Sequence, residues 1–143
     1  MFRALTDRIS ASPQITPDDV RDAAAQGVGL IINNRPEDES ADQTPGDAIE
    51  AAARAAGIDY VAIPVTHAGF SEGQVKAMAA ALASTDKPVL AYCRSGTRST
   101  LLWALAESSR GKSPHALSAA AAQAGYDLTP VRAMMDMLSA NAL

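Results

Sequence analysis

The sequence predicts one α/β domain, with a central, mostly parallel sheet of four to five strands flanked by helices. Short apolar runs rich in β-branched residues alternate along the chain with segments that carry helix-start signals. This alternation implies parallel strands joined by right-handed crossovers, with helices on both faces of the sheet. The length of 143 residues is about that of one domain, so we expect residues 1–143 to fold as a single unit.

Helix starts are marked by a hydroxyl residue followed by proline, in the pairs Thr16-Pro17, Thr44-Pro45, Ser113-Pro114 and Thr129-Pro130. The hydroxyl can accept a hydrogen bond from a free backbone N–H, and proline in the first turn loses none. Ser71 and Gln74 have the spacing of a capping box, which marks a further start. Glycines stand where three of these helices should end, at Gly27, Gly57 and Gly125. The predicted helices cover residues 17–26, 45–56, 72–84, 114–124 and 130–140.

Apolar runs predict strands that are buried on both faces, at residues 28–33, 58–65 and 88–93, and a weaker run predicts another at 8–11. After the run at 88–93, the segment from Leu101 to Ala106 is apolar at almost every position. A helix that is apolar nearly all round lies in the interior. The loop around Cys93 should therefore join the carboxyl end of a central strand to a central helix, which is where open α/β sheets bind ligands.

The overall charge restricts the partners. A net charge of −4 and a pI near 5.0 argue against nucleic acid and anionic membranes, which need a basic face. No apolar run is long enough to span a membrane, and the first residues lack the apolar core of a signal peptide, so we expect a cytoplasmic protein. One cysteine and two histidines provide neither an internal disulfide nor a cysteine/histidine metal cage, and we expect no metal or cofactor. These features leave the oligomeric state open.

The segment CRSGTRS, from Cys93 to Ser99, has the chemistry of a site for a small anionic substrate. A cysteine at a helix N-terminus faces unpaired N–H groups and the positive end of the helix dipole, which favour the thiolate. Arg98 can grip two oxygens of a tetrahedral anion, and Ser99 can hydrogen-bond the sulfur. Glycine in the loop lets successive N–H groups turn inward around an anion. The predicted anion cradle consists of Arg94, Ser95, Gly96 and Thr97.

The alternative is that Cys93 is an inert core residue, because free cysteine is among the most buried residue types. That alternative must also explain a glycine-containing turn with two arginines between a buried strand and a buried helix. A nucleophilic cysteine explains all of these features, so we expect Cys93 to be catalytic.

Three segments, IINNRPEDE, YVAIPV and YCRSGTRS, resemble in this order the bacterial beta-lactamase-hydrolase-like, phosphatase-like domain family. The resemblance covers residues 3–110, and the first and last segments are fairly specific when they occur together. It implies a dual-specificity-phosphatase-like fold with four or five parallel strands. It also implies a cysteine-dependent phosphatase or, for some members, a sulfur transferase.

The loop departs from the phosphatase pattern in ways that bear on the reaction. Phosphatases place five residues between cysteine and arginine, whereas Cys93 and Arg98 enclose four, a length that resembles single-domain rhodaneses. Tyr92 stands where phosphatases usually have histidine. By the same resemblance, the position of the general-acid aspartate falls on His67, a residue type that can protonate a leaving alkoxide near neutral pH.

Other polar residues near the predicted strand ends have a functional and a structural interpretation. His67 either acts as the acid or hydrogen-bonds a backbone carbonyl in its loop. Glu72 is the substitute acid or, as we favour, a charge in the first turn of a helix. Asn34 and Arg35 end the strand at 28–33 and should lie on the rim of the site, where Arg35 binds a substrate anion or pairs with the acidic residues Glu37, Asp38 and Glu39.

Three functions follow, and we place them in order. The first is a cysteine-based phosphatase that forms a phosphocysteine on Cys93. The second is a rhodanese-like sulfurtransferase that carries a persulfide on Cys93. The third is a non-catalytic module that binds an anion while the thiol stays protonated.

Overall fold

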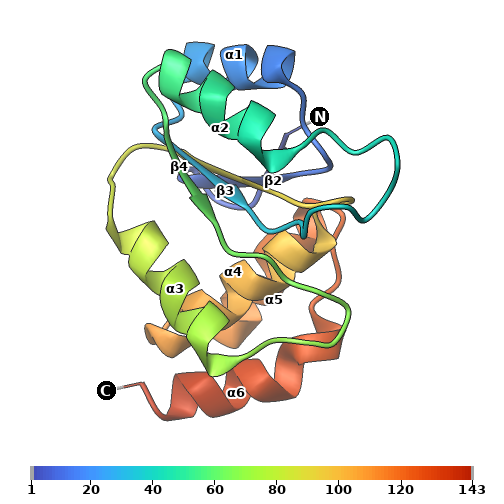
Figure 1. Ribbon diagram of the computed structural model, residues 1–143. Helices are drawn as coiled ribbons and strands as arrows, with labels where there is room; N and C mark the ends of the chain where they lie inside the picture. Colours follow the sequence, from blue (N-terminus) through green and yellow to red (C-terminus); the bar gives the residue numbers. More distant parts are fainter. Residues whose placement is uncertain (1, 143) are drawn as a thin grey trace.

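Five strands form one sheet in the order β1-β2-β5-β3-β4 (Figure 1). The computed structural model describes residues 2–142. The strands are β1 (Arg3–Ala4), β2 (Ile9–Ser12), β3 (Leu30–Asn33), β4 (Asp59–Ala62) and β5 (Val89–Tyr92). β1 pairs antiparallel with β2, and the other neighbours are parallel. The predicted α/β class and mostly parallel sheet are confirmed, whereas the short β1 was not predicted.

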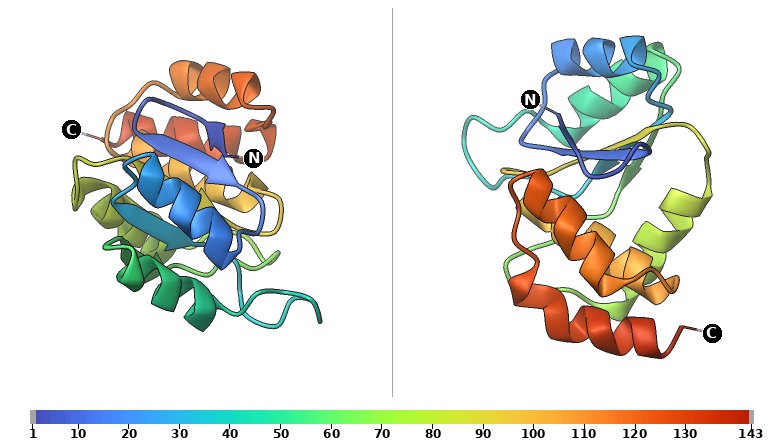
Figure 2. Two further views of the ribbon diagram at one scale, coloured as in Figure 1. Left: turned by 90° about the horizontal axis from the view of Figure 1, so that it is seen from above. Right: turned by 180° about the vertical axis from the view of Figure 1, so that it is seen from behind.

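Helices cover both faces of the sheet (Figures 1 and 2). The helices α1 (Pro17–Ala25) and α2 (Gly46–Ala55) lie on one face. On the other lie α3 (Glu72–Ala83), α4 (Thr97–Ser109), α5 (Pro114–Gln123) and α6 (Arg132–Ala140). The alternation along β3 divides the core, because Ile31 packs with the α1 and α2 side chains while Ile32 packs with those of α3 and α4.

The central position of β5 and α4 follows from their sequences. All four residues of β5 are buried, and so is every residue of α4 from Leu101 to Ala106, as predicted. β4, by contrast, is an edge strand whose residues are exposed or half-buried, so the expectation that it is buried on both faces is wrong. The loop after β5 thus lies between the best-buried strand and the best-buried helix.

The predicted helix starts are correct where a side-chain cap forms. Thr16, Ser71 and Ser113 each accept a hydrogen bond from the backbone of the following turn. Thr44 does not cap α2; Oε1 of Glu37 accepts from the N–H of Gly46 at 2.9 Å in its place. The start predicted at Thr129 is also wrong, because residues Thr129–Val131 form a 3₁₀ turn and α6 begins at Arg132.

Thr16→Ala is expected to lower the free energy of unfolding by about 1 kcal/mol. The Thr16 hydroxyl accepts from the N–H of Asp19, and the Asp19 carboxylate accepts from the N–H of Thr16 at 2.9 Å, so the substitution opens a reciprocal cap. Urea unfolding followed by the fluorescence of Trp103, the single tryptophan, measures the change. Thr44→Ala is the control and should leave stability nearly unchanged; equal losses in the two variants would refute this account of α1.

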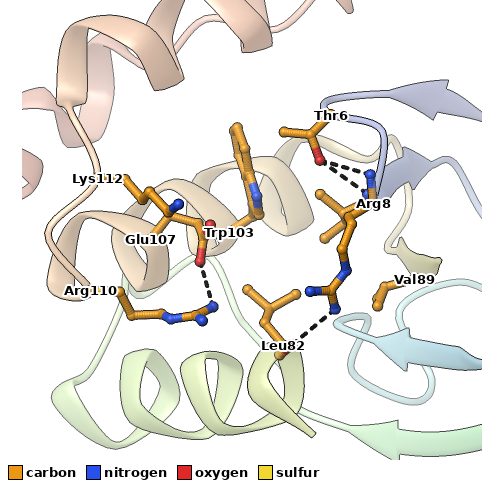
Figure 3. Close-up of a pocket in the computed structure, with 9 residues that line it drawn as sticks. Thr6, Arg8, Leu82, Val89, Trp103, Glu107, Arg110 and Lys112 are labelled. Atoms are coloured by element: carbon orange, nitrogen blue, oxygen red, sulfur yellow. Dashed lines mark hydrogen bonds and ion pairs between the residues drawn. The ribbon is translucent and has the colours of Figure 1, made fainter. Parts of the chain in front are cut away.

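A cavity of about 270 Å³ lies at the end of the sheet opposite the Cys93 loop, where β2 and β5 begin (Figure 3). Two arginines that line the cavity already have partners within the protein. Nη2 of Arg8 donates to the carbonyl of Leu82 at 3.1 Å, and Nη1 of Arg110 contacts Oε1 of Glu107 at 2.9 Å. The Arg8 bond ties the end of α3 to the sheet, and the Arg110 pair lies within the end of α4, so we interpret the cavity as a structural junction. No helix within residues 2–142 is long and apolar enough to cross a membrane.

Candidate active site

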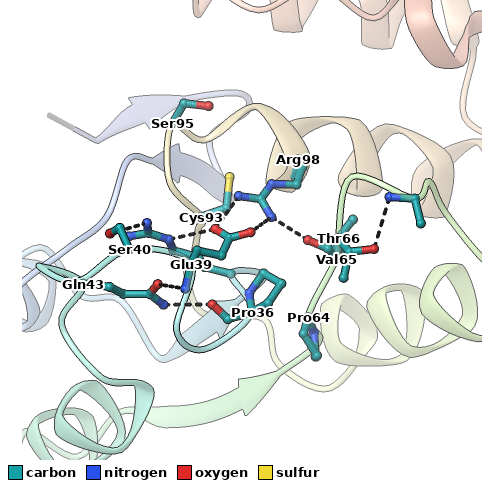
Figure 4. Close-up of polar contacts among 12 residues, drawn as sticks. Pro36, Glu39, Ser40, Gln43, Pro64, Val65, Thr66, Cys93, Ser95 and Arg98 are labelled. Carbon is teal, nitrogen blue, oxygen red and sulfur yellow. Dashed lines mark hydrogen bonds and ion pairs between the residues drawn. The ribbon is translucent and has the colours of Figure 1, made fainter.

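Segments that follow three neighbouring strands meet at the carboxyl edge of the sheet (Figure 4). The first comes after β3 and contributes Glu39, the second comes after β4 and contributes Val65, and the third is the Cys93 loop after β5. All three meet at the side chain of Arg98. The topology therefore brings the Cys93 loop to the carboxyl edge of the sheet, between a central strand and a central helix, as the sequence predicted.

Cys93 is fully buried at the base of the loop. The N–H of Gly96 donates to its Sγ at 3.1 Å. Gly96 immediately precedes α4 and has φ of +91°, a left-handed conformation that glycine adopts without strain. The sulfur therefore receives a hydrogen bond at the amino end of a buried helix, an arrangement that stabilises negative charge.

Several backbone amides of the loop are free to bind an anion. Within the described part of the chain, the N–H groups of Arg94, Ser95, Arg98 and Ser99 donate to no protein acceptor. The N–H of Thr97 donates to Oγ of Ser95 at 3.3 Å, and Oγ of Ser95 donates in turn to Oγ1 of Thr97 at 3.0 Å. Unpaired amides at a helix N-terminus are the usual protein site for an oxyanion.

Arg98 is held in one orientation by three acceptor contacts. Its Nη1 donates to Oε2 of Glu39 at 2.7 Å and to the carbonyl of Val65 at 2.6 Å, and its Nη2 donates to Oε1 of Glu39 at 2.9 Å. A guanidinium has five N–H donors, so the Nε–H and one Nη2–H remain. Figure 4 shows the Cys93 sulfur beside this guanidinium. The two remaining donors form a fork that can grip two oxygens of a bound anion.

Glu39 also binds Arg35, so one carboxylate joins two buried arginines. Nε of Arg35 donates to Oε1 of Glu39 at 2.9 Å, and its other nitrogens donate to Oε1 of Gln14 at 3.0 Å and Oγ of Ser40 at 3.1 Å. All three nitrogens of Arg35 are thus engaged. Of the two interpretations of Arg35, the structure shows the pairing with the acidic run.

The two arginines change the acid–base behaviour of this network. The hydrogen bond from Arg98, followed by that from Arg35, lowers the pKa of Glu39 from 4.5 to about 2, against the opposing effect of burial. The same hydrogen bond, which Glu39 accepts, raises the pKa of Arg98, with a smaller contribution from the neighbouring Cys93. Glu39 is therefore a fixed negative charge at any moderate pH.

Two predicted site residues serve the framework in this structure. Asn34 is fully buried, and its Nδ2 donates to the carbonyl of Ile63 at 3.0 Å, so it braces the segments after β3 and β4 instead of lying open on the rim as expected. The Oγ of Ser99 is buried without a partner among residues 2–142, so the expected hydrogen bond to the sulfur is not formed.

The remaining predicted residues lie on the surface. Arg94, Ser95 and Thr97 are exposed around the loop, which leaves Arg94 able to meet an incoming anion. His67 is exposed on the segment after β4 and forms no hydrogen bond within the described residues. Glu72 pairs with Lys76 at 2.9 Å on the first turn of α3, which is the structural interpretation that we favoured.

Sequence reasoning missed two residues of the site. Glu39 was recognised only as a partner for Arg35, although the acidic run that contains it was visible. The second is Tyr126, whose hydroxyl donates to the carbonyl of Ser95 at 3.1 Å from beyond α5. No local pattern distinguishes Tyr126 from a core tyrosine, because only the tertiary structure brings it to the loop.

The fold and this loop define a domain of the cysteine-phosphatase fold. One structural neighbour, PTPMT1 in complex with PI(5)P, has a TM-score of 0.75 at 13% identity, covers 99% of each chain and shows the fold alone. The crystal structure of a phosphatase-like protein from Neisseria meningitidis is 31% identical, with a TM-score of 0.82 over 95% of this chain and 96% of the other. Residues 1–111 match the family described as beta-lactamase hydrolase-like protein, phosphatase-like domain, and the chain belongs to that family.

A curated relative agrees with this assignment. The beta-lactamase hydrolase-like protein of Xylella fastidiosa is 39% identical over 103 residues, which are 72% of this chain and 24% of the relative. The chain thus spans about a quarter of the length of that relative. The resemblance expected from the sequence is confirmed, and the domain is phosphatase-like.

Proposed function

We propose that this domain is a cysteine-dependent hydrolase of small phosphate monoesters. The observation that carries the proposal is the Arg98 guanidinium, which Glu39 and Val65 hold beside the Cys93 sulfur with a two-donor fork still free. The unpaired loop amides supply further donors to the phosphoryl oxygens. The similarity to phosphatase-like structures supports the same reaction class.

In this mechanism the Cys93 thiolate attacks phosphorus, and the bond from phosphorus to the ester oxygen breaks. Arg98 and the loop amides bind the oxygens of the transferred group, where negative charge accumulates in the transition state. The departing alkoxide takes a proton from His67, which is exposed on the segment after β4. Water then attacks the phosphocysteine, the S–P bond breaks, and inorganic phosphate leaves.

Cys93→Ser is expected to lower turnover of a small aryl phosphate by at least about 1,000-fold, because serine is a much weaker nucleophile in this position. Vanadate, which resembles the phosphoryl transition state, should inhibit the wild-type enzyme. The measurement is release of the aryl alcohol by wild type, Cys93→Ser and His67→Gln. Absence of turnover by the wild type on every phosphate ester tried would exclude this function.

Sulfur transfer is the second candidate, and two observations favour it. The loop encloses four residues between Cys93 and Arg98, which makes the cradle smaller than that of a phosphatase. The Cys93 sulfur is also fully buried, so a single sulfur atom reaches it more easily than a phosphoryl group. The thiolate would attack the outer sulfur of thiosulfate, the S–S bond would break with loss of sulfite, and the persulfide would pass its outer sulfur to a thiol or cyanide.

One side-by-side assay distinguishes the candidates. Wild type and Cys93→Ser are incubated with an aryl phosphate and, separately, with thiosulfate plus cyanide. Thiocyanate formation and a mass increase of one sulfur atom on the wild-type protein would support sulfur transfer. If neither substrate reacts and Cys93 alkylates like an ordinary thiol, the domain is the non-catalytic anion-binding module.

A further inference from the structure

The peptide unit between Ser95 and Gly96 lies between two side chains. Its carbonyl oxygen accepts a hydrogen bond from the Tyr126 hydroxyl at 3.1 Å, and its N–H donates to the Cys93 sulfur at 3.1 Å. The C=O and N–H of a trans peptide point in opposite directions within one plane. A group that holds the carbonyl therefore also fixes the direction of the N–H.

Tyr126 is itself held in place. It is buried, its N–H donates to the carbonyl of Ala121 at 2.9 Å, and the Arg3 guanidinium lies 5.3 Å from the centre of its ring. Burial raises the pKa of the Tyr126 hydroxyl, and the nearby Cys93 raises it further, against the opposing effect of Arg3. The Tyr126 hydroxyl therefore stays protonated, and able to donate, at neutral pH.

The loop at Gly96 packs closely against Tyr126 on one side and against the backbone of Ser12 on the other. A side-chain carbon at Gly96 would overlap the Tyr126 hydroxyl and lie 3.3 Å from the backbone of Ser12. The loop is therefore confined between the end of β2 and Tyr126. Tyr126 also lies outside residues 1–111, the part that matches the family.

We propose that Tyr126 is a positioning residue for Cys93, acting through the Ser95–Gly96 peptide to aim its N–H at the sulfur. The hydrogen bond to the carbonyl also polarises the peptide and strengthens the N–H as a donor to the thiolate. This inference rests on the proposed role of Cys93 as the nucleophile. It assigns part of the site to the segment after α5.

Tyr126→Phe tests the inference, because it keeps the ring and removes only the hydroxyl. The thiolate of Cys93 is titrated by its ultraviolet absorbance, with the Cys93→Ser protein as blank; Cys93 is the only cysteine, so no other thiol contributes. The midpoint is expected to rise by about half a pH unit to one pH unit, the size of one weakened hydrogen bond to an anion.

Tyr60→Phe is the matched control. Tyr60 is a half-buried phenol whose hydroxyl accepts from Nδ2 of Asn33 at 2.9 Å, and within residues 2–142 it forms no hydrogen bond with the Cys93 loop. Its removal should leave the thiol midpoint unchanged. Identical titrations of Tyr126→Phe and the wild type, in a variant with wild-type Trp103 fluorescence, would overturn the proposal.

A second measurement decides the matter if Tyr126→Phe does not fold. Hydrogen exchange of the wild-type protein should show the Gly96 amide protected at least about 10-fold over that of the exposed Gly73. Rapid exchange at Gly96 would overturn the proposal. Neither measurement uses a substrate, so failure of the proposed reaction and failure of the positioning role are separate results.

Discussion

Glu39→Ala is expected to lower the free energy of unfolding by about 3–5 kcal/mol, because it leaves two buried arginines without their shared carboxylate. Arg35 is 4% exposed and Arg98 is 9% exposed, so water replaces the lost bonds poorly. The Arg98 guanidinium would also lose two of its three fixed contacts, and with them the orientation of its free fork. Urea unfolding followed by Trp103 fluorescence measures the loss in the free energy of unfolding.

Glu50→Ala provides the control for this prediction. Glu50 pairs with Arg54 on the exposed surface of α2, with 2.6 Å between Oε2 and Nη2. Exposed pairs of this kind contribute little, so the control should change stability by less than about 0.5 kcal/mol. Similar losses in the two variants would show that the Glu39 network is not structural.

The same carboxylate should limit stability in acid. Because the pKa of Glu39 falls from 4.5 to about 2 on folding, its stabilising contribution is complete above pH 4.5 and is lost as the pH falls toward 2. The stability difference between wild type and Glu39→Ala should therefore shrink over that interval. A constant difference from neutral pH down to pH 2 would contradict the assignment.

Gly96→Ala is expected to cost about 3 kcal/mol, as the sum of backbone strain and steric overlap. The residue has φ of +91°, and its new methyl group would collide with the Tyr126 hydroxyl and approach the backbone of Ser12. Relief requires the loop or Tyr126 to move: a movement of the loop breaks the hydrogen bond to the Cys93 sulfur, and a movement of Tyr126 breaks its bond to the Ser95 carbonyl. The thiolate titration and urea unfolding of the variant measure the two effects.

Gly57→Ala separates strain from overlap. Gly57 has φ of +76°, yet nothing lies within 4 Å of the position where a side-chain carbon would stand. This control should therefore lose only about 1 kcal/mol, the cost of the backbone conformation. If Gly96→Ala loses no more than Gly57→Ala, the close packing of Tyr126 on the loop is not energetically important.

The sequence predicted the parts of the fold that depend on local chemistry. The apolar runs gave β3 and β5, and caps such as Thr16 and Ser71 gave helix starts. Errors arose where a distant residue decided the outcome. Glu37 supplies the α2 cap expected from Thr44, and the edge position of β4 reflects sheet order, which no single segment encodes.

In the site, too, the residues that could be predicted are those whose roles depend on nearby residues in the sequence. Cys93, Gly96 and Arg98 were recognisable because their roles lie within one short loop between a strand and a helix. Asn34 and Arg35 have partners inside the protein, and for Arg35 this is the pairing with the acidic run that was one of its two interpretations. The roles of Glu39 on Arg98 and of Tyr126 on Ser95 could not be predicted, since 59 and 31 residues separate the partners.

Those separations have a consequence for folding. The contact between Glu39 and Arg98 closes a loop of 59 residues. Closing a loop of this length lowers the entropy of the chain, so the contact that orients Arg98 should form only after other parts of the fold have brought the two residues together. The contact of Tyr126 with Ser95 forms only when the chain beyond α5 has docked. The proposed activation of Cys93 should therefore arise late in folding, after the chain beyond α5 has been synthesised and has docked.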